Sequence, residues 1–80
     1  DNISLVELFQ WDEKTFMGKM AGSAIYRIGH AQWLRNIAVG LGNAATSPEV
    51  IQALECRRND PSELVREHVI WALNQHAKQR

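Results

Sequence analysis

The sequence contains one cysteine, two prolines and no long run of apolar residues. The single cysteine, Cys56, excludes an internal disulfide and any metal site made only of cysteines, and it fits a reducing, cytoplasmic setting. No apolar run approaches the ~18 residues of a membrane-spanning helix. The first residues also lack the basic and apolar regions of a signal peptide. We therefore expect no membrane partner.

Acidic residues are missing from one long stretch of the chain. The whole sequence has nine Lys and Arg against nine Asp and Glu, and this zero net charge argues against a partner bound through bulk charge. Between residues 14 and 48, however, there are four Lys and Arg and no carboxylate. The acids lie in residues 1–13 and 49–67. This local excess of positive charge is the first indication of function.

Apolar residues are plentiful enough for a folded domain. Leu, Ile, Val and Phe make up a quarter of the 80 residues, above the roughly 20% below which disorder is common. A chain of this length forms one domain at most and buries only about 60% of its unfolded surface. Residues 1–80 are therefore expected to form a single domain of marginal stability.

The apolar pattern is helical nearly throughout, and no stretch alternates with the period of a strand. Capping residues divide the chain into short helices. We expect them after Ser4, from Asp12 to Gly22, over 24–28, over 31–41 with Gly42-Asn43 as its end, after Ser47-Pro48 to about 58, and after Asp60-Pro61 to about 77. The sequence predicts an all-α fold of five to six short helices.

A weak internal repeat relates two of these helices. Residues 34–38 (Leu-Arg-x-x-Ala) align with residues 65–69 (Val-Arg-x-x-Val) at an offset of 31. Residues 60–73 are similar to the loop and first helix of a HEAT-type unit, in which stacked helix pairs share a core. We therefore expect a HEAT-like helical-repeat pair at the C-terminal end. Because two units are few for a solenoid, such a pair would need a neighbouring domain to pack against.

The residues that most often carry metal or catalytic chemistry are scattered. His30, His68, His76 and Cys56 have no metal-ligand spacing, so we expect no metal site, a partly buried His68 and an exposed His76. Cys56 lies near a helix C-terminus and is interpreted as structural. The glycines form no phosphate-binding loop, and no carboxylate pair suggests acid–base chemistry. No residue is predicted to be catalytic.

The acid-free stretch remains the best candidate site. Its side chains can donate hydrogen bonds to phosphate, and Tyr26 and Trp33 interleave with them for stacking on bases. The candidates are Lys14, Lys19, Arg27, His30, Arg35 and Asn36. The alternative is that Arg35 is a structural arginine of a helical repeat, Trp33 belongs to the core and the lysines are simply solvated.

Three segments resemble the C-terminal domain of epoxyqueuosine reductase. They are LFxWxExxF at residues 8–16, GSAIYRIGH at 22–30 and WLRNIAVGLGN at 33–43. The resemblance covers nearly all 80 residues and is strongest over 22–43. The family pattern usually has two adjacent arginines where this chain has Tyr26-Arg27, and alanine is common where it has Gly40.

The resemblance implies that this chain is a fragment of an iron–sulfur and cobalamin-dependent reductase that completes queuosine in the tRNA anticodon. The [4Fe–4S] clusters and the cobalamin would belong to catalytic domains upstream, because one cysteine cannot hold such a cluster. The chain itself would not be an enzyme. It would help to receive the tRNA anticodon stem-loop, with Arg27, Arg35 and Asn36 as the matching positions and His30 less secure.

Two functions therefore stand side by side. The first is a tRNA-binding and domain-packing accessory module of an epoxyqueuosine reductase-like enzyme, whose upstream domains are its second partner. The alternative is a structural or protein–protein HEAT-repeat module without a role in nucleic-acid binding.

Overall fold

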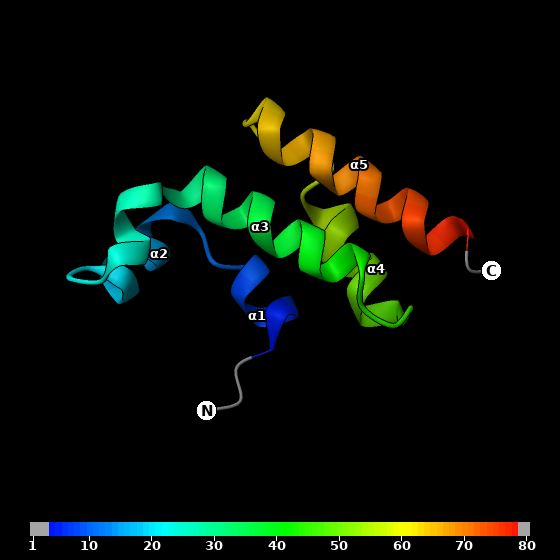
Figure 1. The fold of residues 1–80 in the computed structure, drawn as a ribbon, viewed down its shortest axis with the longest axis horizontal. Coiled ribbons are helices and arrows are strands. Elements are labelled where there is room, and N and C mark those ends of the chain that lie inside the picture. Colours follow the sequence, from blue (N-terminus) through cyan, green and yellow to red (C-terminus); the bar gives the residue numbers. More distant parts are fainter. Residues whose placement is uncertain (1–3, 79–80) are drawn as a thin grey trace.

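The structure is a computed structural model that describes residues 4–78, and within this range it contains helices and no strand. The elements are α1 (Leu5–Phe9), α2 (Glu13–Met20), the 3₁₀-helix η1 (Ala24–Ile28), α3 (His30–Gly42), α4 (Pro48–Cys56) and α5 (Glu63–Lys78) (Figure 1). This confirms the predicted all-α fold of short helices. Asp1 and Arg80, which enter the charge count, lie outside the described residues.

The predicted capping residues begin three of the helices. Ser4 and Glu7 form a capping box, in which each side chain accepts a hydrogen bond from the other residue's backbone N–H. The carboxylate of Asp12 accepts from a backbone N–H in the first turn of α2, at 2.8 Å. Ser47 caps α4 in the same way, directly before Pro48. These contacts satisfy N–H groups that a helix start otherwise leaves unpaired.

The start of α5 differs from the predicted pattern. Instead of Asp60 capping the helix with Pro61 as its first residue, Ser62 accepts from the backbone N–H of Val65, and α5 begins at Glu63. Asp60 accepts from the backbone N–H of Ser62 and so shapes the preceding turn. The cap therefore lies two residues later than the analogy with Ser47-Pro48 suggested.

Two glycines with positive φ enclose η1. Gly22 follows α2 and Gly29 precedes α3, and both have φ of 85°, which side chains with a Cβ rarely adopt. The sequence predicted both positions as helix ends. Together they turn the chain sharply on either side of η1, so that every residue from 21 to 28 is exposed.

Gly42 has a different role from the one predicted. It was expected to end its helix with a left-handed conformation, but α3 continues through Gly42 and the C-cap Asn43 has φ of −97°. A Cβ at position 42 would lie 2.5 Å from Cζ3 of Trp71 and 3.0 Å from Cβ of Ala72. Gly42 therefore lies at a close approach of α5 to α3, and the lack of a side chain leaves room for Trp71 and Ala72.

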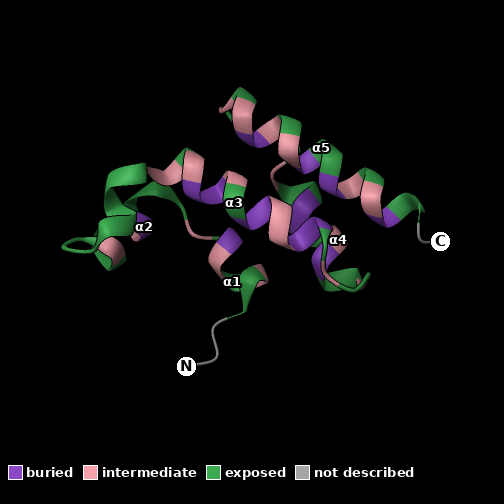
Figure 2. Cartoon of the chain, in the orientation of Figure 1, coloured by how far each residue is buried: buried purple, intermediate pink, exposed green. Residues whose placement is uncertain are grey.

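The core lies between α3 and the helices around it (Figures 1 and 2). Contacts from residue 35 to 68 and from 41 to 76 show that α3 and α5 lie side by side and run in the same direction. These are the two helices that the internal repeat relates. The buried apolar side chains are Phe9, Phe16, Trp33, Leu34, Ile37, Ala38, Leu41, Val50, Ala53, Leu54, Val65, Val69 and Ala72. Full burial of a Leu or Val contributes roughly 1.5–3 kcal/mol.

Met17 and Trp71 reach solvent, and one histidine is not where the sequence placed it. Met17 is 43% exposed and Trp71 is 37% exposed. His76, predicted to be exposed, is completely buried. Within residues 4–78, no helix has both the length and the apolar character needed to cross a membrane.

Candidate nucleic-acid interface

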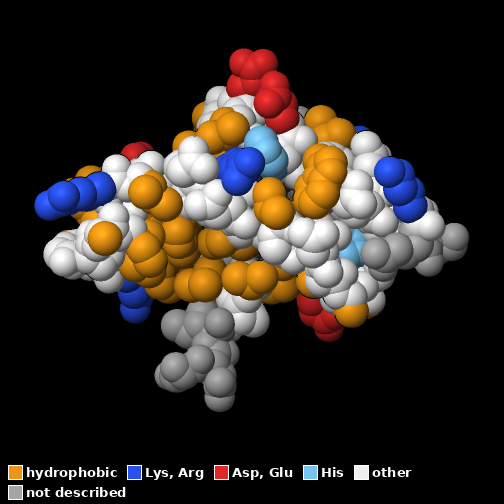
Figure 3. Space-filling view, in the orientation of Figure 1, with side chains coloured by type: hydrophobic (Ala, Val, Ile, Leu, Met, Phe, Trp, Pro, Cys, Tyr) orange, Lys and Arg blue, Asp and Glu red, His pale blue; other side chains and the backbone are white. Residues whose placement is uncertain are grey.

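Most of the predicted phosphate-binding side chains reach solvent. Lys14, Lys19, Arg27 and Asn36 are exposed, whereas His30 and Arg35 are half-buried. The ion pairs within residues 4–78 are Arg57–Asp60 and Arg58–Glu55, so no cation of the predicted site is paired with a carboxylate there. Figure 3 shows Lys and Arg side chains at the α2–η1 end and over α3.

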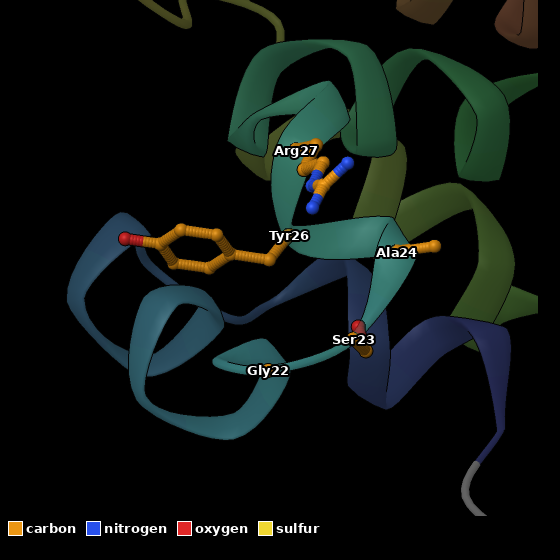
Figure 4. A pocket seen from close by; sticks show the side chains of 5 residues that line it. All are labelled: Gly22, Ser23, Ala24, Tyr26 and Arg27. Atoms are coloured by element: carbon orange, nitrogen blue, oxygen red, sulfur yellow. The ribbon is translucent and has the colours of Figure 1, made fainter.

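Arg27 lies on η1 beside a shallow hollow of about 340 Å³. The hollow is lined by Gly22, Ser23, Ala24, Tyr26 and Arg27 (Figure 4). Within the described residues the guanidinium of Arg27 has neither a hydrogen bond nor an ion pair. The Tyr26 ring, 39% exposed, leaves η1 in a different direction from Arg27. An exposed guanidinium and an aromatic face therefore adjoin the same depression.

Arg35 is held in place by α5. Its Nε donates to Nε2 of His68 at 3.1 Å, and one terminal nitrogen donates to Oδ1 of Asn36 at 3.1 Å. Nδ1 of His68 lies 2.8 Å from the carbonyl of Leu64, so the ring proton sits on Nδ1 and Nε2 is free to accept. Arg35 thus links α3 to α5, as the alternative interpretation expected, while its other terminal nitrogen keeps its donors.

His30 and Lys19 flank a cluster of aromatic rings. Nε2 of His30 donates to the carbonyl of Trp11 at 2.8 Å, and its ring lies 5.5 Å from that of Phe16. Trp11 stacks on Trp33 with ring centroids 5.4 Å apart, and the ammonium of Lys19 lies 5.9 Å from the Trp11 ring. Both basic side chains therefore take part in the packing of the α1–α2 connection.

Carboxylates lie close to one of the predicted contacts. A shallow cleft beside His30 is also lined by Asp12, Glu13 and Asp60. The hydrogen bond from the backbone N–H of Thr15, and then its hydroxyl, holds the pKa of Asp12 below its usual value of 3.8. Asp12 is thus ionised at neutral pH, which makes the cleft a poorer phosphate site than the surroundings of Arg27.

The structure joins some predicted residues and leaves others apart. Arg35 and Asn36 contact each other on α3, and His30 and Lys19 adjoin the same aromatic cluster. Within residues 4–78, no hydrogen bond or ring contact connects Arg27 or Lys14 with the other four. The same part of the chain contains no group of three metal-ligating side chains.

Sequence comparison relates the chain to enzymes of one kind. It is 55% identical over 78 residues to the epoxyqueuosine reductase of Pseudomonas aeruginosa, 60% identical over 76 residues to that of Xanthomonas campestris, and 49% identical over 76 residues to that of Escherichia coli. These alignments cover 98%, 95% and 95% of the chain but 22%, 21% and 20% of the relatives. Along nearly all of its length, the chain is related to epoxyqueuosine reductases.

The resemblance to epoxyqueuosine reductases seen in the sequence motifs is thereby confirmed. The chain spans about a fifth of the length of the curated relatives that it matches. No family model matches the chain, and no solved structure does.

The sequence interpretation missed Arg57, the most connected arginine of the fold. Its Nε donates to the carbonyl of Phe9 at 2.6 Å, and its terminal nitrogens donate to the carbonyl of Trp11 at 2.7 Å and to Asp60 at 2.9 Å. It lies at the C-cap of α4. Contacts 46 and 48 residues away in the sequence leave no local pattern to find.

The burial of His76 could have been predicted. Residues 65, 69, 72 and 76 follow each other at spacings of four, three and four, and all are buried. Nε2 of His76 donates to the carbonyl of Leu41 at 2.7 Å, and Nδ1 accepts from the hydroxyl of Thr46 at 2.7 Å. A histidine with both nitrogens bonded can occupy the core, because its polar groups are satisfied.

Proposed function

We propose that this HEAT-like helical module binds tRNA and packs on the other domains of an enzyme similar to epoxyqueuosine reductase. That enzyme would reduce epoxyqueuosine to queuosine in the tRNA anticodon, and this module would bring the anticodon stem-loop to it. The observation that carries the proposal is Arg27, which is exposed in an acid-free region and makes no ion pair within residues 4–78. The similarity to the reductases gives the class of RNA.

The binding would be electrostatic. Arginine is permanently charged and offers planar pairs of N–H donors that match phosphate oxygens. Arg27 offers its donors from η1, and Arg35 offers those that its bonds to His68 and Asn36 leave over. Lys14 and Lys19 add attraction that salt screens. Each phosphate contact should add about 0.7–0.9 to the dependence of log affinity on log salt concentration.

The cofactors of such an enzyme would be held outside this chain. A [4Fe–4S] cluster needs four thiolates, and the sequence has one cysteine. Residues 4–78 offer no metal-ligating group either, so we assign no catalytic step to this module. Iron–sulfur clusters and cobalamin, if the enzyme contains them, belong to the remaining four fifths of its length.

Exposed apolar side chains support the domain-packing part of the proposal. Leu5, Met17, Ile25 and Ile28 are 41–44% exposed. Figure 3 shows apolar side chains gathered in a broad area on the face that carries α1 and the α2–η1 end. A contiguous apolar surface is typical of an interface with other protein. A module that lay free in solution would leave this surface in contact with water.

The test is a titration of a labelled tRNA anticodon stem-loop with the longer protein proposed to carry this chain. The double variant Arg27→Ala/Arg35→Ala should bind more weakly. Its slope of log affinity against log salt concentration should also be smaller by about 1.4–1.8, because two phosphate contacts are lost. Lys78→Ala, which removes a charge from the last turn of α5, is the matched control. Thermal unfolding shows whether the loss of the Arg35–His68 bond has altered the fold. Unchanged affinity and salt dependence in a folded double variant would refute the tRNA-binding role.

A structural or protein–protein module without a nucleic-acid role is the second candidate, and the exposed apolar surface favours it. Two observations separate the candidates. The rest of a reductase should contain the cluster-binding run C-x-x-C-x-x-C-x-x-x-C-P, and a protein of another kind should lack it. In addition, a purely structural module should show no dependence of RNA binding on Arg27.

A further inference from the structure

We propose that the hollow beside η1 holds one nucleotide of a single-stranded RNA segment, with Arg27 on its phosphate and the Tyr26 ring on its base. This inference rests on the proposed function, because it assumes that the module binds RNA. It goes further by naming the place, the strandedness and the two groups that make the contact.

The shape of η1 brings the two side chains to one hollow. A 3₁₀-helix has three residues per turn, so consecutive side chains leave it roughly 120° apart. Tyr26 and Arg27 are consecutive, and Figure 4 shows the ring and the guanidinium pointing in different directions at the edge of the hollow. A nucleotide also presents its base and its phosphate on different sides. One ligand can therefore meet both groups.

The size of the hollow limits what it can take. Its volume of about 340 Å³ lies at the lower end of the roughly 300–1,000 Å³ usual for small-ligand pockets. Its walls are small, since Gly22, Ser23 and Ala24 complete the lining. A backbone with short side chains allows close approach, and Gly22 has no heavy atom within 4 Å of where a Cβ would lie. One nucleotide fits this space, and a longer segment would extend beyond it.

The chemistry of the hollow favours a single strand. In a double helix the bases are stacked on one another, whereas unpaired bases of a loop can stack on an aromatic side chain. Tyr26 is 39% exposed, so part of its surface is open to a base. The lining suits phosphate, because Arg27 is the charged residue among the five that line the hollow and none of them is a carboxylate.

The experiment measures binding of a labelled RNA stem-loop and of a blunt RNA duplex of equal length to the longer protein that carries this chain. Tyr26→Ala should weaken stem-loop binding roughly 5- to 150-fold, the range for loss of one stacked base. Tyr26→Phe keeps the ring and should bind like the unaltered protein. Arg27→Ala should lower the salt dependence by about 0.7, the value for one phosphate of a single strand. Lys78→Ala should leave the salt dependence nearly unchanged, and the duplex should be insensitive to Tyr26→Ala.

Each result decides between the inference and the proposed function. If Tyr26→Ala has no effect while Arg27→Ala lowers the salt dependence, the hollow binds phosphate alone and the nucleotide site is refuted. If neither substitution matters but replacing Lys14, Lys19 and Arg35 weakens binding, the module binds RNA elsewhere and only this inference fails. If no variant alters binding, the proposed function fails with it. Because Tyr26 and Arg27 are exposed, the variants at these two positions should unfold at the temperature of the unaltered protein.

Discussion

Replacement of Gly42 by alanine tests the packing of α3 against α5. The added Cβ would lie 2.5 Å from Cζ3 of Trp71, 3.0 Å from Cβ of Ala72 and 3.1 Å from its Cα. The Trp71 ring is partly exposed and can move, but the backbone of Ala72 can yield only if α5 shifts. Overpacking of this kind costs typically 1–3 kcal/mol. Alanine is roughly 1 kcal/mol more favourable than glycine in a helix, and this gain offsets part of the overpacking cost. We therefore expect Gly42→Ala to lower the free energy of unfolding by about 1–2 kcal/mol.

Gly40→Ala is the matched control, since it makes the same chemical change two residues earlier. Its Cβ would meet only Cδ1 of Leu5, at 3.0 Å, and Leu5 is 41% exposed and able to move aside. We expect this variant to be as stable as the original or up to about 1 kcal/mol more stable. Thermal unfolding followed by circular dichroism measures both, at about 4–8 °C per kcal/mol for a domain of this size. If Gly42→Ala unfolds no earlier than Gly40→Ala, the close approach of α5 is wrong.

Three further substitutions test other contacts. Arg57→Ala removes three charge-assisted hydrogen bonds and should lower the free energy of unfolding, measured in urea, by at least about 2 kcal/mol. Arg58→Ala breaks an exposed ion pair and should lower it by less than about 1 kcal/mol. Equal losses would contradict the structural role of Arg57. His76→Phe keeps a buried ring but loses both hydrogen bonds, so a loss of about 1–2 kcal/mol is expected, and an unchanged midpoint would show that these bonds contribute nothing. The pKa of Asp12 is lowered in the folded state, so Asp12 stabilises the fold fully above pH 3.8 and loses this contribution as the pH falls from there through the lower folded pKa. In Asp12→Asn, stability should therefore depend less on pH in this acidic range. An acid-unfolding profile identical to that of the unaltered protein would refute this.

Local features of the sequence predicted the helices well. Ser4, Asp12 and Ser47 cap helices because each needs only a backbone N–H two or three residues away, which a short motif specifies. Gly22 and Gly29 end elements because their positive φ is a property of the residue itself. The weak repeat relates α3 to α5 in the sequence, and the structure places these two helices side by side.

What the sequence did not predict depends on contacts between distant elements. Gly42 looks the same in the sequence whether it ends a helix or admits a neighbouring one, and the approach of Trp71 decides between these roles. Arg57 and Arg58 are adjacent in the sequence. Only the position of the α1–α2 connection makes Arg57 a central structural residue and leaves Arg58 on the surface. The candidate site was affected in the same way, because the bond to His68 could not be predicted from the surroundings of Arg35 alone.

The contacts of the arginines also limit how strongly this module can bind RNA. Arg57 uses its donors inside the fold, and Arg35 uses part of them, so Arg27 is the arginine of the acid-free stretch with all of its donors available within the described residues. One or two phosphate contacts on a single strand give a salt dependence of about 0.7–1.4, which is only about a 3- to 7-fold loss of affinity between 50 and 200 mM salt. Proteins that bind nucleic acid mainly through charge lose roughly 10³- to 10⁵-fold over the same range. Under the proposed function, a neutral module of this kind would orient an RNA loop, and most of the binding free energy would come from the rest of the longer protein.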